Sequence, residues 1–310
     1  MEMRPLGTNG PQLSVVGYGA WEAGGDEWGP NESDERVVAA IRTALDSGMN
    51  WIDTAEVYGG GTSERLVAQV LAAHPDVMVF TKVAPAPAGT GFRADEVRAA
   101  ATGSLERLGR DCIDLYQLHW PDPRVDVEET WEAMAGLVEE GLIGCAGVSN
   151  FGRELIERCE RIRHVDSLQP EFSMLHRDGR DDLFIHCEQA GTGVIAYGPL
   201  AYGLLTGAID ASTEFSNDDW RSGKHGMGSY EELFAPPVIG RHLEVVDRLR
   251  PIAEELGITL PKLGLAWVFH QRGVAGAIAG SRSPEHTREN AEAGDVELSG
   301  EVLERIEQVL

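Results

Sequence analysis

The chain alternates short apolar segments with amphipathic segments along its whole length. The amphipathic segments have the period of a helix: in 95–108 and 127–140, apolar residues recur every three or four positions. Strands that alternate with helices in this way form parallel sheets covered by the helices. The segments that predict strands are 14–19, 50–54, 77–83, 113–119, 143–149, 167–171, 193–197 and 274–279.

Eight strand–helix units in 310 residues predict a (β/α)8 barrel, the TIM-barrel fold, as a single domain over residues 1–310. Residues 3–13, with Thr8-Asn9-Gly10 at their centre, predict a β-hairpin that closes the bottom of the barrel. A long segment, 201–240, follows the seventh strand, and segments of this length usually carry function. A doubly wound dinucleotide-binding sheet is the weaker alternative, because residues 17–22 lack the third glycine of its fingerprint.

The charge of the chain excludes one class of partner. Asp and Glu total 51 against 26 Lys and Arg, a formal net charge of −25, whereas nucleic-acid binding needs a basic face. No apolar run approaches the roughly 18 residues of a membrane span, and the N-terminal residues lack the apolar core of a signal peptide. We therefore expect a cytoplasmic protein without nucleic-acid or membrane partners; its oligomeric state stays open. The widely spaced cysteines predict reduced thiols: Cys112, Cys145, Cys159 and Cys187.

Polar and aromatic side chains follow the predicted strands, at the ends where barrels carry their chemistry. Because the carboxyl ends of the strands meet at one rim, these side chains should converge there. In chain order they are Asp53, Tyr58, Lys82, His119, Trp120, Ser149, Asn150, Gln169, Tyr197 and Arg282.

Four of these residues have the chemistry of a proton-transfer group. A tyrosine hydroxyl titrates near pH 10 in water, so a catalytic Tyr58 needs a nearby cation to stabilise its phenolate. Lys82 can supply that cation, and Asp53 can keep the lysine charged inside the barrel. His119 can orient a substrate carbonyl oxygen. Such a group predicts that Tyr58 protonates the oxygen of a bound carbonyl.

The motif Asp53-x-Ala55-x-x-Tyr58-Gly59, followed by Lys82 and His119, resembles the catalytic tetrad of the aldo-keto reductase superfamily, and the resemblance covers essentially the whole chain. It implies NADPH-dependent reduction of aldehydes or ketones to alcohols, and the reverse oxidation. The cofactor-binding residues that it implies are Gly19, Ala20, Trp21, Ser149, Asn150, Gln169, Tyr197, Gly198, Pro199, Leu200, Gly203, Leu205, Gly280, Ser281, Arg282, His286, Glu289 and Asn290.

Individual cofactor contacts follow from the chemistry of these side chains. Ser149, Asn150 and Gln169 are expected to hydrogen-bond the nicotinamide carboxamide, and Tyr197 to stack on the ring. Arg282, beside Ser281 and just before a helix, is expected to contact a 2′-phosphate, which favours NADP(H) over NAD(H).

The substrate is predicted to be a small carbonyl compound, and its pocket to include Trp21, Trp120 and Trp220. The loops 21–28, 120–124 and 201–240 are expected to set its identity. An apolar, aromatic mouth favours an aromatic or alicyclic carbonyl.

Alternative interpretations remain. Taken alone, Asp53 is explained as a strand-end cap or ion-pair partner, Tyr58 as a loop aromatic and His119 as a core histidine; their occurrence on three consecutive strands favours catalysis. An NADPH-binding sensor or accessory subunit would bind the cofactor tightly, turn over negligibly and associate with a stoichiometric partner. A metal-dependent barrel enzyme would need clusters of His, Asp and Glu at the rim, and few are present, so no metal is expected.

Overall fold

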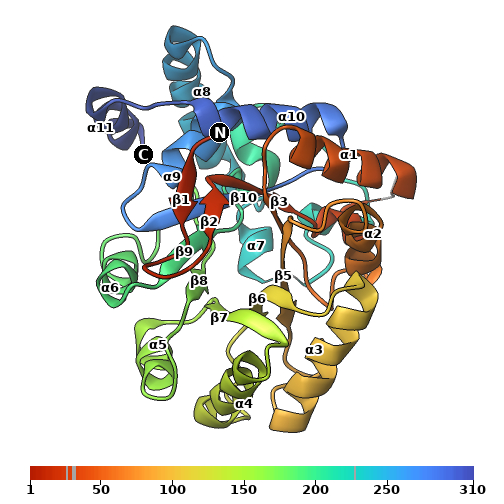
Figure 1. Ribbon diagram of the computed structural model, residues 1–310. Coiled ribbons are helices and arrows are strands. Elements are labelled where there is room, and N and C mark those ends of the chain that lie inside the picture. Colours follow the sequence, from red (N-terminus) through yellow and green to blue (C-terminus); the bar gives the residue numbers. More distant parts are fainter. Residues whose placement is uncertain (26, 30–32, 227) are drawn as a thin grey trace.

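The computed structural model describes residues 1–25, 27–29, 33–226 and 228–310, and in them the chain forms a closed parallel barrel (Figure 1). The last strand pairs with the first, with Ala277 opposite Val16. The predicted (β/α)8 fold is therefore confirmed. The strands are β3 (Val16–Gly19), β4 (Trp51–Asp53), β5 (Met78–Val83), β6 (Ile113–Leu118), β7 (Ile143–Ser149), β8 (Ser167–Gln169), β9 (Gly193–Ala196) and β10 (Val274–Gly280).

Helices surround the barrel because each carries one apolar face. In α4, Trp131 and Met134 are fully buried against the strands, as their spacing predicts. The outer helices are α1 (Asp34–Asp46), α2 (Thr62–Leu71), α3 (Ala94–Leu108), α4 (Val127–Glu139), α5 (Arg153–Glu160), α6 (Leu183–Ala190), α9 (Leu260–Phe269) and α10 (Pro284–Glu292), with α8 (Val238–Leu256) and α11 (Gly300–Val309) added beside them. No helix in the described part of the chain is both long and apolar enough to cross a membrane.

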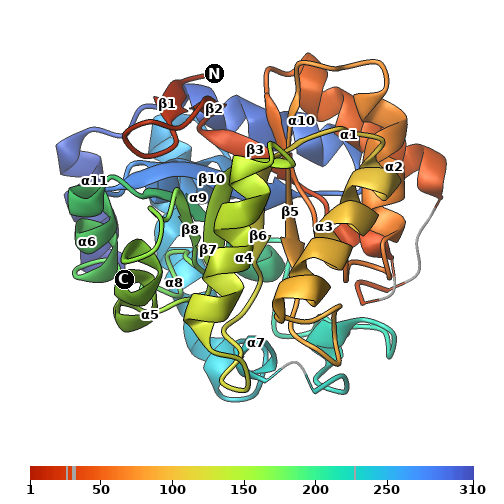
Figure 2. The same cartoon turned by 60° about the horizontal axis from the view of Figure 1, so that its bottom comes forward.

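The predicted hairpin is present and closes the amino end of the barrel. Its strands, β1 (Met3–Pro5) and β2 (Gln12–Ser14), pair with Met3 opposite Ser14. Figure 2 shows the hairpin at one end of the barrel and the short α7 (Ser229–Glu232) at the other. An apolar plug fills the interior next to the hairpin: Leu6, Leu13, Trp51, Phe80, Leu115 and Ile195.

A close approach inside the plug explains one of the glycines at the start of the barrel. A Cβ atom on Gly17 would lie 2.1 Å from the ring of Trp51. Gly17 therefore makes room for a core tryptophan, in a strand that does not open a doubly wound sheet.

The long segment 201–240, of which Met227 lies outside the described residues, packs over the loop that follows β3. It contains the 3-10 helices η2 (Ala201–Thr206) and η3 (Trp220–Ser222), then α7. The backbone N–H of Trp220 donates to the carbonyl of Glu27 at 2.9 Å, and Asp219 forms a β-bridge with Trp28. The predicted loop region 21–28 includes Asp26, which also lies outside the described residues. These two loops together wall one side of the barrel mouth.

Candidate active site

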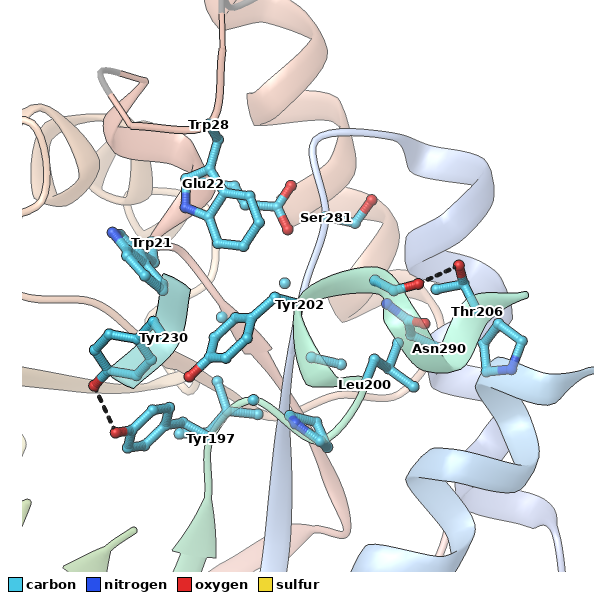
Figure 3. Close-up of a pocket in the computed structure, with 18 of the residues that line it drawn as sticks. Trp21, Glu22, Trp28, Tyr197, Leu200, Tyr202, Thr206, Tyr230, Ser281 and Asn290 are labelled. Carbon is cyan, nitrogen blue, oxygen red and sulfur yellow. Dashed lines mark hydrogen bonds between the residues drawn. The ribbon is translucent and has the colours of Figure 1, made fainter. Parts of the chain in front are cut away.

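A cavity of about 1120 Å³ opens at the carboxyl end of the barrel, and most of the predicted site residues line it. Figure 3 shows its aromatic and polar wall from Trp21 to Asn290. Those that line it are Gly19, Trp21, Asp53, Tyr58, His119, Trp120, Ser149, Asn150, Gln169, Tyr197, Gly198, Pro199, Leu200, Gly203, Gly280, Ser281, Arg282, His286, Glu289 and Asn290.

Four predicted residues lie behind the cavity wall. Ala20, Lys82, Leu205 and Trp220 are each buried and do not line the cavity. Lys82 still reaches the site through its ammonium group. Trp220 does not face the substrate space as predicted: its ring stacks against Trp21 at a centroid distance of 6.1 Å and an interplanar angle of 15°. It therefore supports Trp21 from behind.

Lys82 is the centre of a buried ionic cluster at the floor of the cavity. Its Nζ donates to Asp53 Oδ1 at 2.5 Å, to the carbonyl of Thr54 at 2.8 Å and to the Tyr58 hydroxyl at 3.3 Å. The Lys82 and Asp53 side chains are 0% and 4% exposed. Neighbouring barrel strands β4 and β5 bring the pair together, and the turn after β4 returns Tyr58 over it. A buried charge pair with this many hydrogen bonds is satisfied electrostatically.

Burial outweighs the cation in setting the protonation of Tyr58. Loss of water around the phenol, followed by the negative charge of Asp53, raises the pKa of Tyr58 well above its usual value. Burial also lowers the pKa of Lys82, while Asp53 opposes that shift. The expected contact between Lys82 and Tyr58 is present. Because the pKa of Tyr58 is nevertheless raised, its hydroxyl is protonated at neutral pH. That state is the one a proton donor needs.

His119 presents a neutral imidazole to the same hydroxyl. Its Nε2 lies 3.5 Å from the Tyr58 oxygen, and its ring stacks on Trp120 at a centroid distance of 3.7 Å. Burial and then the charge of Lys82 hold the pKa of His119 well below the usual range. Its Nδ1 is enclosed without a hydrogen-bond partner among the described residues. A substrate oxygen between Tyr58 and His119 would meet two uncharged hydrogen-bonding groups.

The predicted amide group forms a connected network beside the tetrad. Asn150, which has a positive φ of 61°, donates from Nδ2 to the carbonyl of His119 and to Ser149 Oγ, both at 3.1 Å. Ser149 Oγ donates to the backbone carbonyl of Gln169 at 2.8 Å, and the Tyr197 hydroxyl donates to Asn150 Oδ1 at 2.8 Å. The left-handed backbone at Asn150 turns its side chain back onto these partners.

At the other end of the cavity, Arg282 joins the loop after β3 to the end of β10. Its Nη2 donates to the carbonyl of Trp28 at 2.9 Å and its Nη1 to that of Gly29 at 3.2 Å. The Glu22 carboxylate lies 3.9 Å from its Nε. Helix α10 begins just beyond, capped by Ser283. A guanidinium beside a helix N-terminus favours a phosphate.

Sequence reasoning missed several residues of the cavity and its floor. Tyr230 comes from α7, and its hydroxyl lies 2.8 Å from that of Tyr197 (Figure 3). Arg221 and Arg250 add two guanidinium groups to the lining. Gln117 lies inside the barrel, and its Nε2 donates to Asp53 Oδ2 at 3.4 Å. Only Gln117 left a usable signal, as a polar residue two positions before His119 in the same predicted strand.

Comparisons with known proteins agree with this geometry. The model of the family described as "Aldo/keto reductase family" matches residues 15–310. The chain is 31% identical to the aldo-keto reductase YhdN of Bacillus subtilis, over all of this chain and 94% of that protein. It is 29% identical to a probable voltage-gated potassium channel subunit beta of Arabidopsis thaliana, over all of this chain and 97% of that protein. Among solved structures, it is similar to the glycerol dehydrogenase of Gluconobacter oxydans, with a TM-score of 0.87 and 31% identity over 99% of this chain and 94% of that one.

Proposed function

Because the chain belongs to the aldo/keto reductase family, we propose that it reduces aldehyde or ketone carbonyls to alcohols with NADPH, and catalyses the reverse oxidation. Carbonyl oxidoreduction with a nicotinamide cofactor is the activity of this family. The observation that carries the proposal for this chain is the Lys82–Tyr58–His119 group at the floor of a cavity large enough for both cofactor and substrate.

Tyr58 is the proton donor in the direction of reduction. Burial keeps its hydroxyl protonated, and Lys82 Nζ, 3.3 Å away, stabilises the phenolate that remains after transfer. Asp53 balances the charge of Lys82. The neutral His119 directs the carbonyl oxygen toward Tyr58 by a hydrogen bond. The cofactor supplies the hydride.

The residues present fit a phosphorylated dinucleotide at two places in the cavity. Ser149, Asn150 and Gln169 form the amide side that would hold the carboxamide, with Tyr197 next to it. Ser281, Arg282 and the start of α10 would hold the 2′-phosphate, which supports NADP(H) over NAD(H). Trp21, Trp120 and Tyr230 would then border the substrate.

The first test is turnover with a panel of small aldehydes and ketones, with NADPH and NADH supplied separately. We expect oxidation of NADPH with at least one carbonyl. Tyr58→Phe should lower kcat by roughly 10²–10⁴-fold, because it removes the general acid, while cofactor binding is retained. Unchanged turnover in Tyr58→Phe would refute the assigned mechanism.

Arg282→Ala tests the cofactor preference. The Kd for NADPH should rise by at least tenfold more than the Kd for NADH, because a charge-assisted hydrogen bond contributes about 1.5–3 kcal/mol. Arg282 also holds the carbonyls of Trp28 and Gly29, so a purely structural loss would weaken both cofactors equally. Titration of the purified variant with each cofactor separates these outcomes.

A second candidate function is suggested by the relative named as a potassium channel subunit beta. A sensor or accessory subunit would bind NADPH tightly, turn over no carbonyl in the panel and copurify with a stoichiometric partner. The complete set of Asp53, Tyr58, Lys82 and His119 in hydrogen-bonding arrangement favours the enzyme.

A further inference from the structure

Gln117 is a fully buried polar side chain in the barrel interior, on β6. It lies opposite Lys82 on one neighbouring strand and Gly147 on the other. A Cβ atom on Gly147 would come within 3.1 Å of Gln117 Cγ. The glycine therefore leaves the space that this glutamine occupies.

Gln117 joins the tetrad to the amide side of the cavity. Its Nε2 donates to Asp53 Oδ2 at 3.4 Å, and its Oε1 accepts from Gln169 Nε2 at 3.3 Å. Gln169 Nε2 also donates to Asp53 Oδ2, at 2.8 Å. An ionised carboxylate only accepts hydrogen bonds, so Asp53 requires both amides to turn their NH2 groups inward. The network therefore fixes the orientation of both glutamines.

The orientation of Gln169 has a consequence for the cavity. Both of its N–H groups are used inside the barrel, one on Asp53 and one on Gln117. Its carbonyl oxygen Oε1 accepts nothing from the described residues, and Gln169 lines the cavity. Gln169 thus offers the cavity an acceptor, whose natural partner is an NH2 group.

We propose that Gln117 is a positioning residue, which holds Gln169 so that its Oε1 accepts a hydrogen bond from the NH2 group of the cofactor carboxamide. This inference rests on the proposed use of a nicotinamide cofactor. Without Gln117, one buried N–H of Gln169 loses its acceptor while the other still donates to Asp53, so the amide tilts to satisfy the lost bond and Oε1 moves away from the carboxamide. Gln117 itself is fully buried and does not line the cavity.

The test compares two nucleotides that differ only in the group facing Gln169. NADP⁺ carries a carboxamide, whereas its 3-acetylpyridine analogue carries an acetyl group and has no NH2 to donate. Gln117→Leu should weaken NADP⁺ binding roughly three- to tenfold, the equivalent of one neutral hydrogen bond. The same variant should weaken the analogue by less than about twofold, because the wild type already lacks that bond with it. Binding is measured by calorimetry, without turnover.

Two further variants keep the test decisive. Ser167→Ala removes a buried hydroxyl that has no partner among the described residues and whose Cβ borders the same space at Gly147; it should leave both Kd values unchanged. Gln117→Met, which removes the same hydrogen bonds with an unbranched side chain, replaces Gln117→Leu if the leucine variant fails to fold.

If the Gln117 variant bound both nucleotides more weakly by the same factor, or bound both as tightly as the wild type, the positioning role would be overturned. If the wild-type protein binds neither nucleotide, the proposed function fails, and this inference fails with it. The two failures are therefore distinguished by the wild-type titration alone.

Discussion

Tyr58 and His119 are both held uncharged by their surroundings. Burial raises the pKa of the phenol and lowers that of the imidazole, so each favours its neutral form at the pH where a carbonyl reductase works. The charges of the site are confined to the Asp53–Lys82 pair beneath them. A substrate carbonyl would therefore contact the uncharged Tyr58 and His119. The charged Asp53 and Lys82 lie beneath them and would act from a greater distance.

The neutral state of His119 makes stability depend on pH. In the unfolded chain this histidine takes up a proton near its usual pKa of 6.5, whereas in the folded protein its pKa is well below that value. The unfolded state therefore binds more protons below pH 6.5. This contribution to stability is complete above that pH and is lost as the pH falls toward the folded pKa, by up to about 1.4 kcal/mol per pH unit.

Urea denaturation of the wild type and of His119→Gln at a series of pH values measures this dependence. The free energy of unfolding of the wild type should fall more steeply below pH 6.5. The exposed His225→Gln is the control for loss of a histidine elsewhere. Parallel curves for wild type and His119→Gln would contradict the buried neutral state.

At this scale the sequence predicts which residues meet but not their protonation. Asp53, Lys82 and His119 could be placed because each ends a strand, and strand order fixes the neighbours. The pKa of Tyr58 could not be predicted, since it depends on depth of burial, which strand order does not give. The role of Gln117 depends on hydrogen bonds to Asp53 and Gln169 across the barrel, and no spacing in the sequence encodes them.

Among the elements, the long segment 201–240 mainly supports the loop that follows β3 by packing against it. Trp220 is fully buried, stacks on Trp21 and packs edge-to-face on Trp28 at a centroid distance of 5.5 Å. Trp21 in turn stacks on Tyr58 at 6.2 Å. The segment 201–240 thus reaches Tyr58 through two indole rings. The strands and outer helices could be predicted from periodicity, but this packing of two irregular loops has no periodic signal.

Trp220→Ala should therefore act on stability before it acts on the substrate. Removing a buried tryptophan leaves a cavity and costs about 3–5 kcal/mol of unfolding free energy. Trp120→Ala, at a half-buried ring that lines the cavity, should cost less stability and raise the KM for the carbonyl substrate. Denaturation curves and steady-state kinetics on both variants check this. A Trp220→Ala protein of unchanged stability but raised KM would instead identify Trp220 as a substrate contact.

Across the whole molecule, the net charge of −25 opposes the approach of an anionic cofactor. The arginines that line the cavity, Arg221, Arg250 and Arg282, attract it only at short range. Salt at about 0.1 M screens charges beyond about 10 Å, so it should suppress the repulsion more than the local attraction. The association rate of NADPH should therefore rise with moderate salt in stopped-flow measurements. A steady fall from the lowest salt onward would show that the local cations dominate.

The apolar plug at the amino end of the barrel also limits the exchange of protons between the site and the solvent. Trp51 and Phe80 stand two residues before Asp53 and Lys82 on the same strands, so the layer beneath the ion pair is hydrocarbon. The hairpin side chains Leu6 and Leu13 seal that layer from outside. Water therefore has no path through these residues by which to return a proton to Tyr58 from the amino end of the barrel. Under the proposed mechanism, the proton that Tyr58 gives up in each turnover would return through the mouth of the barrel, by the same opening that the alcohol would use to leave.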